Sequence, residues 1–309
     1  MHLLNLVRRR LARLKPPPTM PKRVAAKHSA MWDLVDKNAA IDRIASGFEF
    51  TEGPVWLPSR GALWFSDIPG NTMHEWRGGI VRTIRKPSRH ANGNTLDLKG
   101  RLLTCEHSAR RITRTQHDGA LTTLADNWEG ARLNSPNDLV VKSDGSIYFT
   151  DPPFGIRPQQ QELEFSGIYR ISAGGELSLL DISMPRPNGI AFSPDESLLY
   201  VDDSQKRELR VFDVAADGSI QNGRRCFDMD DGSSGNPDGM KLDKSGNLFV
   251  TGPGGIWVFS QDMKHIGTIQ LPELPSNCAW GEDGHSLFVT ARRSLYRIRC
   301  LTSGSLLAG

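Results

Sequence analysis

The segment SDGSIYFTD at residues 143–151 decides the fold, because close copies of it recur along the chain. A turn at Asp144 and Gly145 leads into an alternating aliphatic and aromatic run that ends in a carboxylate. Such a run is typical of a β-strand, and the turn before it is typical of a β-hairpin. The related strands are ALWFSD (62–67), RLLTCE (101–106), LLYVDD (198–203), NLFVTG (247–252) and SLFVTA (286–291).

The spacing of these copies predicts the architecture. The first aliphatic residues of the six strands are separated by 39 to 52 residues, and a second apolar strand precedes each turn. Six all-strand units of about 40–50 residues indicate an all-β, six-bladed β-propeller. No G-x-G-x-x-G motif follows a strand, which disfavours a dinucleotide-binding fold. We expect one propeller domain over residues 33–309.

The charge of the chain is distributed unevenly. Residues 1–32 contain eight Lys and Arg and no Asp or Glu, whereas the other 277 residues contain 30 basic and 35 acidic side chains. The propeller is therefore mildly acidic, which disfavours a nucleic-acid partner. No run of 18 apolar residues predicts a membrane span. We expect residues 1–32 to be a disordered extension, with a targeting segment or a misplaced start codon as the alternatives.

The cysteine pattern points to a reducing compartment. Cys105, Cys226, Cys278 and Cys300 form no C-x-x-C pair and no zinc-type spacing with histidine. This excludes a disulfide-dense secreted domain and favours reduced thiols in the cytoplasm. We expect a monomer or a homodimer.

A ring of polar residues is predicted at one end of the propeller. Ten or eleven residues before each repeated strand, where the inner strand of a blade begins, every residue is Asn, Asp or Glu. Inner strands line the central channel, so these side chains should meet at one mouth of it. Oxygen ligands of this kind suit a hard cation such as Ca²⁺. The six positions are Glu52, Asn92, Asn137, Asn188, Asp238 and Asn277.

A second set of carboxylates should lie behind this ring. Folding each hairpin about its turn brings Asp67, Glu106, Asp151 and Asp203 opposite the ring positions, with His107 beside Glu106. The alternative for both sets is that Asn and Asp only shape turns and strand ends. That alternative explains one or two positions more readily than six in register.

The motifs around the ring resemble those of the senescence-marker-protein, regucalcin and gluconolactonase family of six-bladed propellers. They follow in the family's order over about residues 40–300 and most resemble the bacterial gluconolactonase branch. The motifs are EGPVW (52–56), RLNSPNDLVV (132–141), SDGSIYFTDPPFG (143–155), RPNGIAFSPD (186–195), NPDGMKLD (236–243) and SNCAWG (276–281).

The resemblance implies a metal-dependent sugar lactone hydrolase that acts on a lactone such as glucono-1,5-lactone. It places one divalent cation on Glu52, Asn188 and Asp238, with Asn137 as a fourth ligand or a substrate contact, and makes Asp238 the general acid/base. Ca²⁺ is the expected ion, with Mg²⁺, Mn²⁺ or Zn²⁺ as alternatives. The expected substrate contacts are Asn137, Asn92, Asn277, Asp151 and His107.

Other interpretations remain open at this point. A promiscuous metal-dependent esterase or organophosphate hydrolase would use the same ring, and a non-catalytic calcium-binding propeller would need only part of it. No G-x-S-x-G elbow supports a serine nucleophile. The sugar-contacting Arg and Glu of the animal relatives are replaced here by Ser135 and about Gly155. Aromatic candidates for stacking on a sugar are Trp56, Phe154 and Trp280, although such residues more often lie in the core.

Overall fold

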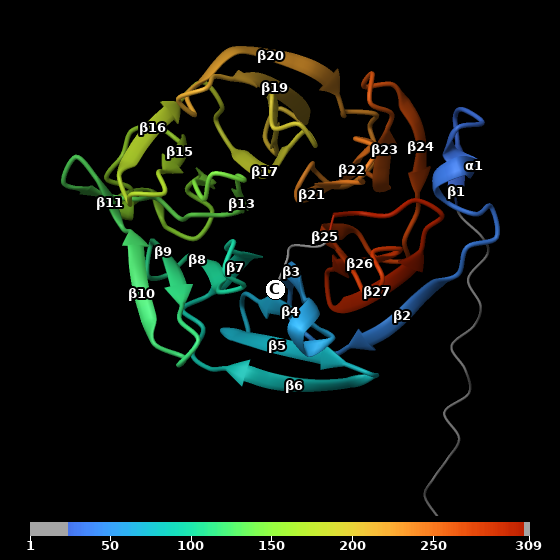
Figure 1. Ribbon diagram of the computed structural model, residues 1–309, viewed down its shortest axis with the longest axis horizontal. Coiled ribbons are helices and arrows are strands. Elements are labelled where there is room, and N and C mark those ends of the chain that lie inside the picture. Colours follow the sequence, from blue (N-terminus) through green and yellow to red (C-terminus); the bar gives the residue numbers. More distant parts are fainter. Residues whose placement is uncertain (1–23, 306–309) are drawn as a thin grey trace, which may run out of the picture.

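Six antiparallel sheets surround a central channel in the computed structural model, which describes residues 24–305 (Figure 1). This confirms the six-bladed β-propeller that the sequence predicts. In blades 1 to 3 the first strand lies at the channel and the fourth at the outer edge. Their strands are β3 (Thr51–Leu57), β4 (Ala62–Asp67), β5 (Thr72–Arg77), β6 (Ile80–Arg85); β7 (Ala91–Leu96), β8 (Leu102–Glu106), β9 (Arg111–Thr115), β10 (Leu121–Ala125); β13 (Leu139–Val141), β14 (Ile147–Asp151), β15 (Gly167–Ile171) and β16 (Leu177–Asp181).

Blades 4 to 6 repeat this arrangement, and the two-stranded sheet β11 (Asn127–Trp128) and β12 (Ala131–Arg132) lies between blades 2 and 3 in the chain. Short 3-10 turns occur at Pro58–Arg60 and Pro158–Gln160. The strands of the last three blades are β17 (Pro187–Phe192), β18 (Leu198–Asp203), β19 (Glu208–Val214), β20 (Ile220–Asp228); β21 (Met240–Leu242), β22 (Leu248–Gly252), β23 (Gly255–Phe259), β24 (His265–Ile269); β25 (Pro275–Gly281), β26 (Ser286–Ala291) and β27 (Ser294–Arg299).

The two ends of the chain close the ring together. Blade 6 receives its outer strand from β2 (Ile41–Ser46), which pairs antiparallel with β27. Because hydrogen bonds join the first and last blades, the propeller has no open seam.

The ordered fold begins before residue 33. Strand β1 (Val24–Ala26) pairs with β24 at the outer edge of blade 5, and the short helix α1 (Met31–Leu34) packs Met31 against the core between blades 5 and 6. The predicted disordered extension, residues 1–32, is therefore wrong for residues 24–32. Residues 1–23, which include most of its basic side chains, lie outside the described residues.

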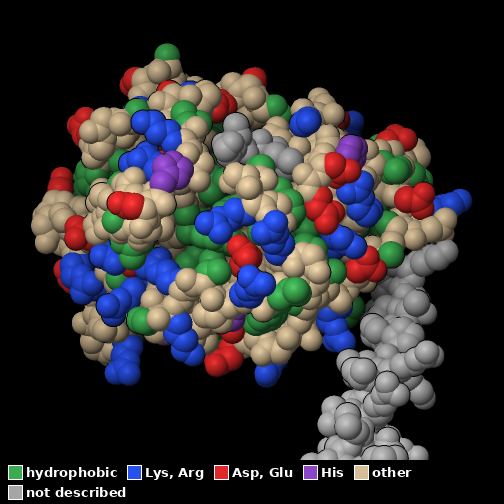
Figure 2. Space-filling model, turned by 60° about the horizontal axis from the view of Figure 1, so that its bottom comes forward, with side chains coloured by type: hydrophobic (Ala, Val, Ile, Leu, Met, Phe, Trp, Pro, Cys, Tyr) green, Lys and Arg blue, Asp and Glu red, His purple; other side chains and the backbone are tan. Residues whose placement is uncertain are grey.

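Apolar cores fill the spaces between neighbouring blades. Leu63 and Phe65 of β4 pack against Phe288 of β26, and the same pattern recurs between the other sheets. Cys105 and Cys278 lie in these cores, and all four cysteines are free. In residues 24–305 no helix has the length and apolar content needed to cross a bilayer. On the side seen in Figure 2, basic and acidic side chains are interspersed.

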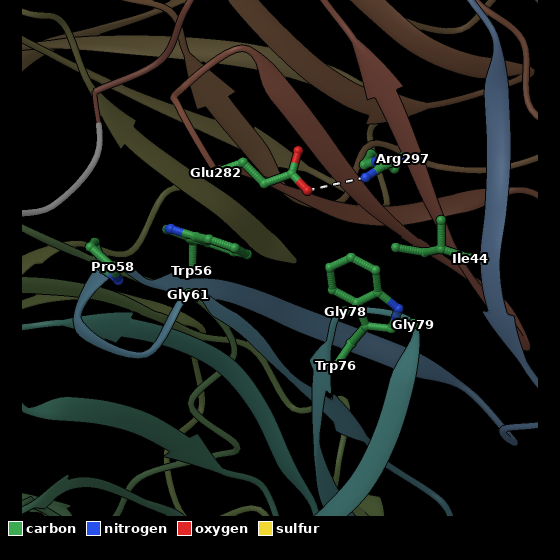
Figure 3. Close-up of a pocket in the computed structure, with 9 residues that line it drawn as sticks. All are labelled: Ile44, Trp56, Pro58, Gly61, Trp76, Gly78, Gly79, Glu282 and Arg297. Carbon is green, nitrogen blue, oxygen red and sulfur yellow. Dashed lines mark hydrogen bonds and ion pairs between the residues drawn. The ribbon is translucent and has the colours of Figure 1, made fainter.

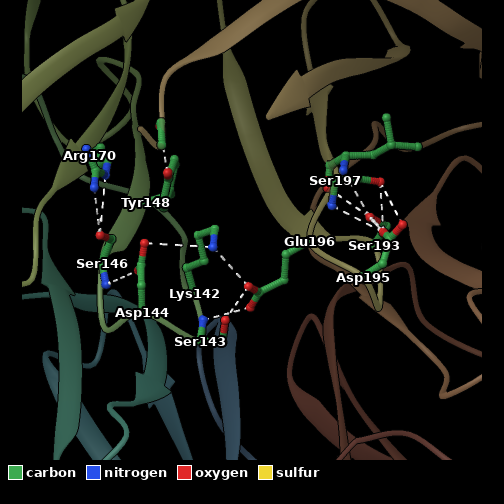
Figure 4. Close-up of polar contacts among 12 residues, drawn as sticks. Lys142, Ser143, Asp144, Ser146, Tyr148, Arg170, Ser193, Asp195, Glu196 and Ser197 are labelled. Atoms are coloured by element: carbon green, nitrogen blue, oxygen red, sulfur yellow. Dashed lines mark hydrogen bonds and ion pairs between the residues drawn. The ribbon is translucent and has the colours of Figure 1, made fainter. Parts of the chain in front are cut away.

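Hydrogen bonds also join the turns at the end where the inner strands finish. Glu196, between β17 and β18, accepts a hydrogen bond from the amide of Ser143 and pairs with Lys142 Nζ at 3.1 Å (Figure 4). In blades 2 to 6 each of these turns also has its own aspartate, such as Asp144, which accepts a hydrogen bond from the amide of Ser146 at 2.8 Å. This turn end is thus braced by ordinary, satisfied polar contacts.

Candidate active site at the channel mouth

The channel opens at its other end, where the inner strands begin, into a cavity of about 330 Å³. Five of the six predicted ring positions line this cavity, one from each of blades 1 to 5. They are Glu52, Asn92, Asn137, Asn188 and Asp238. The structure therefore brings together side chains that are up to 186 residues apart in the sequence.

Glycines explain how the inner strands approach one another so closely. In four blades a glycine follows the ring residue, as in Glu52-Gly53 and Asn188-Gly189. A Cβ atom on Gly53 would lie 1.9 Å from the carbonyl oxygen of Asn92, and one on Gly189 would lie 2.1 Å from that of Asp238. Any side chain there would push neighbouring blades apart. The pairing register also shifts beside Glu52 and Asn188, which turns these side chains toward the channel.

A directed chain of amide hydrogen bonds runs around the mouth. Asn92 Nδ2 donates to Asn137 Oδ1 at 2.6 Å, Asn137 Nδ2 donates to Asn188 Oδ1, and Asn188 Nδ2 donates to Ser204 Oγ at 2.9 Å. Ser204 in turn donates to the carbonyl of Pro237. The chain holds each amide in one orientation and leaves Asn92 Oδ1 buried without a hydrogen-bond partner.

Two carboxyl groups face each other across the cavity floor. Burial, and then the nearby Asp138, raise the pKa of Glu52 to about 7. Burial and the Glu52 carboxyl raise the pKa of Asp238 well above its usual value. Glu52 Oε2 accepts hydrogen bonds from the Gly53 amide and from Asn277 Nδ2, whereas Oε1 is buried and has no partner. The site is therefore short of positive charge.

Two further buried carboxylates were not predicted from the sequence. Asp138 accepts hydrogen bonds from the Leu139 amide and from Asn277 Nδ2, and burial raises its pKa. Asp202 is fully buried with both carboxylate oxygens unpaired, and burial followed by the Asp238 carboxylate raises its pKa well above its usual value. Strand alternation could have identified Asp202. Neighbouring residues of β18 face opposite sides of the sheet, so Asp202 and Asp203 cannot both point the same way.

His107 lines the cavity, and its Nε2 lies 3.0 Å from Asn92 Nδ2. Burial lowers the pKa of His107 to about 4, so the ring is neutral near pH 7 and its Nε2 is the acceptor for the Asn92 amide. Ser135 and Gly155 lie together beside it, with the Gly155 amide donating to Ser135 Oγ.

Two predicted substrate contacts do not line the cavity. Asp151 is fully buried, and its carboxylate accepts hydrogen bonds from the amides of Asn134 and Ser135 at 2.7 Å each. It therefore fixes the loop that enters β13. Asp67 and Asp203 fix the corresponding loops of blades 1 and 4 in the same way. Asn277 lies behind Glu52 and donates a hydrogen bond to its carboxylate at 3.1 Å, so it orients a cavity residue.

Of the three aromatic candidates, only Phe154 lies at the cavity, where 37% of its surface is exposed. Trp56 stacks on Phe288 at 5.5 Å near the turn end, and Trp280 donates its indole N–H to the carbonyl of Leu242. Each follows its ring residue by three or four positions, and four residues of strand span about 13 Å. These two rings are therefore structural.

A larger cleft, of about 810 Å³, opens between blades 1 and 6 near the turn end (Figure 3). It is lined by Trp56, Trp76 and an ion pair between Arg297 and Glu282, in which Nη1 and Oε1 are 3.1 Å apart. Its charged groups neutralise each other, and its lining within residues 24–305 includes no second carboxylate and no side-chain amide. The smaller cavity at the mouth has the reactive groups, so we assign the candidate active site there.

The mouth fits a divalent cation by its donor atoms. Within residues 24–305 no three His, Cys, Asp or Glu side chains form a metal-type cluster, so amide oxygens would have to complete the coordination. Glu52 Oε1 is buried and unpaired, and two adjacent carboxyls have raised pKa values. A hard cation with oxygen ligands would relieve both conditions.

Comparisons with known proteins match most of the chain. Residues 50–293 match the family model described as the SMP-30/gluconolactonase/LRE-like region. The chain is 35% identical to the gluconolactonase of Zymomonas mobilis, over 88% of this chain and 84% of that protein. The solved structure of a Xanthomonas campestris gluconolactonase superposes with a TM-score of 0.83 at 34% identity, covering 90% and 94% of the two chains.

A more distant structure shares the fold. Regucalcin from Agrobacterium tumefaciens, described as a calcium-binding protein, superposes with a TM-score of 0.74 at 19% identity, over 87% of this chain and 96% of that one. The family match covers most of the propeller and includes every residue of the cavity wall. The chain belongs to the SMP-30/gluconolactonase/LRE-like family.

Proposed function

We propose that the protein hydrolyses a sugar lactone such as glucono-1,5-lactone to its aldonic acid, and that one divalent cation at the mouth is required. The observation that supports this most strongly is the pair of adjacent carboxyls, Glu52 and Asp238, with unpaired oxygens beside them in an open cavity. Glu52, Asn188 and Asp238 would hold the cation, with Asn137 as a fourth ligand or a substrate contact. Ca²⁺ is the first candidate, since a distant relative is described as calcium-binding.

A cation bound there would polarise the lactone carbonyl and favour the negative charge that develops on its oxygen. The residues of the chain supply the remaining steps. Asp238 accepts a proton from the attacking water and returns it to the ring oxygen as the C–O bond breaks. Asn277 holds the Glu52 carboxylate in place.

The wall also offers contacts for the sugar. Asn92 Oδ1 is an unused acceptor, suited to a sugar hydroxyl, because its Nδ2 already serves Asn137 and His107. Phe154 presents a partly exposed ring on which a sugar face can stack. These two residues therefore contact the substrate in our proposal, together with Asn137.

The test is hydrolysis of glucono-1,5-lactone in a pH-stat by metal-stripped protein, with Ca²⁺, Mg²⁺, Mn²⁺ or Zn²⁺ added back singly. We expect acid release above the spontaneous rate to return with at least one ion, and EDTA to abolish it. Calorimetric metal binding without acid release would contradict the lactonase proposal. In that case aryl esters and phosphotriesters would distinguish a metal-dependent esterase from a calcium-binding propeller without turnover.

A further inference from the structure

Two arginines lie over aromatic rings of the cavity wall: Arg292 itself lines the mouth cavity, and Arg186 stacks on Phe154, which lines it. The guanidinium of Arg292 lies 5.8 Å from the ring centre of Phe50, and both residues line the cavity with Glu52. The guanidinium of Arg186 lies 5.0 Å from the ring centre of Phe154. Stacking of this kind holds a guanidinium in place while its edge stays free to donate hydrogen bonds.

The two arginines lie on opposite sides of the mouth. Arg292 is in the turn between β26 and β27 of blade 6, and Phe50 precedes β3 of blade 1. Arg186 precedes β17 of blade 4, and Phe154 follows β14 of blade 3. In a ring of six blades, the boundary between blades 6 and 1 is half a turn from the boundary between blades 3 and 4.

Neither guanidinium has a carboxylate partner within residues 24–305. Two other arginines near this end, Arg85 and Arg111, do contact a carboxylate, since both pair with Glu106. Once a divalent cation offsets the charges of Glu52 and Asp238, the rim retains two uncompensated positive charges. This step rests on the function proposed above.

The backbone of Arg292 adopts a conformation that disfavours arginine. It is the first residue of a two-residue hairpin turn, with φ of +47°, where glycine or asparagine is the usual choice. The turn is nevertheless fixed, because the carbonyl of Arg292 accepts a hydrogen bond from the Thr51 amide at 2.7 Å. Arg186 is fixed likewise, since its amide donates to Asp203 Oδ2 at 2.9 Å. The backbones of both arginines are therefore held in place beside the mouth.

We propose that Arg186 and Arg292 bind an oxyanion on the substrate, so that the preferred lactone has an anionic group at the end remote from its carbonyl. A guanidinium recognises phosphate or carboxylate oxygens through two parallel hydrogen bonds, and a neutral sugar has no group that requires this. The carbonyl end then faces Asp238 on the cavity floor, and the anionic end faces the rim.

Binding of stable reaction products tests the proposal without turnover. The metal-loaded protein is titrated calorimetrically with gluconate, 6-phosphogluconate and glucarate, which differ only at the remote carbon. We expect at least one of the two doubly functional acids to bind about tenfold more tightly than gluconate. If 6-phosphogluconate binds more tightly than glucarate, the preferred substrate is a phosphorylated lactone. If glucarate binds more tightly, the preferred substrate is a lactone of a sugar diacid. Equal affinity for all three would overturn the proposal.

Variants locate the effect. Arg292→Gln and Arg186→Gln should each reduce the preference for the doubly anionic product over gluconate to threefold or less. Arg60→Gln is the matched control, because Arg60 stacks on Trp64 at 5.3 Å near the turn end, away from the cavity. Thermal unfolding checks that each variant folds, and Arg292→Lys provides a second variant that keeps the charge but loses the paired hydrogen bonds. An unchanged preference in both Gln variants would contradict the assignment.

Lactone hydrolysis separates this proposal from the proposed function. If glucono-1,5-lactone is hydrolysed but 6-phosphogluconate and glucarate bind no more tightly than gluconate, only the proposal for Arg186 and Arg292 fails. If the anionic products bind preferentially but no lactone is hydrolysed with any metal, the rim proposal stands and the lactonase proposal fails. If both stand, the Gln variants should raise KM for the anionic lactone and leave kcat unchanged.

Discussion

Aspartates at the turn end of the channel and at its mouth lie in opposite electrostatic environments. At the turn end, hydrogen bonds from the Arg299 side chain and the His285 amide lower the pKa of Asp283. Hydrogen bonds from Ser193 and Ser197 lower the pKa of Asp195 in the same manner. At the mouth, burial and neighbouring carboxylates raise the pKa of Asp238. Each turn carboxylate is thus satisfied, whereas the mouth carboxylates repel one another in the absence of a cation.

This difference separates stability from function within one fold. A carboxylate that accepts backbone amides stabilises its turn and has no free oxygen for a ligand. A buried carboxylate without such donors destabilises the metal-free protein but is ready to bind a cation or a proton. Substitutions at the two ends should therefore have opposite consequences, and this can be measured.

The largest effect is expected for Asp238→Asn. We expect lactone hydrolysis to fall by about 10³-fold or more, since the variant loses a cation ligand and the proton acceptor together. Calorimetry should show weaker metal binding. The metal-free variant should also be more stable than the metal-free wild type, by roughly 1 kcal/mol or about 2–4 °C in Tm, because one of the repelling carboxylates is gone. Activity near the wild-type level would remove Asp238 from the mechanism.

A second prediction concerns pH and metal. A carboxyl with a raised pKa in the folded state stabilises the fold when protonated, and this contribution is lost as pH rises from its unfolded pKa toward its folded pKa. The pKa of Glu52 is raised to about 7, and that of Asp238 is raised well above its usual value. The Tm of the metal-free protein should therefore fall between pH 5 and pH 7.

Added cation should reverse this trend, because it favours the ionised carboxyls. At a free concentration 1,000 times Kd it should stabilise the protein by about 4 kcal/mol. Thermal unfolding of Asp238→Asn over the same pH range is the control, and its Tm should vary less. A Tm that rises with pH in the metal-free wild type would contradict our account of the mouth.

The sequence was sufficient to predict the six blades and the position of most of the ring residues. Each blade buries its own apolar alternation, so the repeat is visible along the chain. Five ring positions follow from their constant offset to these strands. Asp202 was missed, and Asp203 was placed near the ring, because a register shift between Pro187 and Ile190 changes which residue of β18 faces the channel. Such a shift depends on packing between neighbouring blades, which one strand's sequence does not encode.

Asp151 and strand β1 show the same limit. The residue that pairs across a hairpin can be counted, but the loop amides that Asp151 binds come from a segment with no repeat pattern. The three residues of β1 are too few to show alternation, and their pairing partner β24 is more than 200 residues away. The rim arginines also lie in connecting segments, where only the folded structure shows that they meet the cavity.

A third prediction addresses the turn end. Asp97 accepts hydrogen bonds from the amides of Lys99 and Arg101 and forms an ion pair with the Arg101 side chain. Burial acts to raise the pKa of Asp97, yet these donors together lower it. Asp97→Ala should reduce the free energy of unfolding by about 1–3 kcal/mol while metal affinity and kcat stay unchanged. Chemical denaturation measures the first quantity and calorimetry the second; a loss of metal affinity in the folded variant would show that the two ends are coupled.

The smallest effect is expected at Glu196, whose contacts with Ser143 and Lys142 join the turns of blades 3 and 4 at a half-exposed site. Its own backbone has φ of +58°, a conformation in which glycine is less strained than glutamate. Glu196→Gln keeps part of the hydrogen bonding and removes the charge, so it should cost less than about 1 kcal/mol. Glu196→Gly loses every contact but relieves the backbone, so the two effects should nearly cancel. If Glu196→Gly instead destabilises the protein by several kcal/mol in chemical denaturation, the contact between blades 3 and 4 does more than brace two turns, and the turn end contributes to the alignment of the blades that form the mouth.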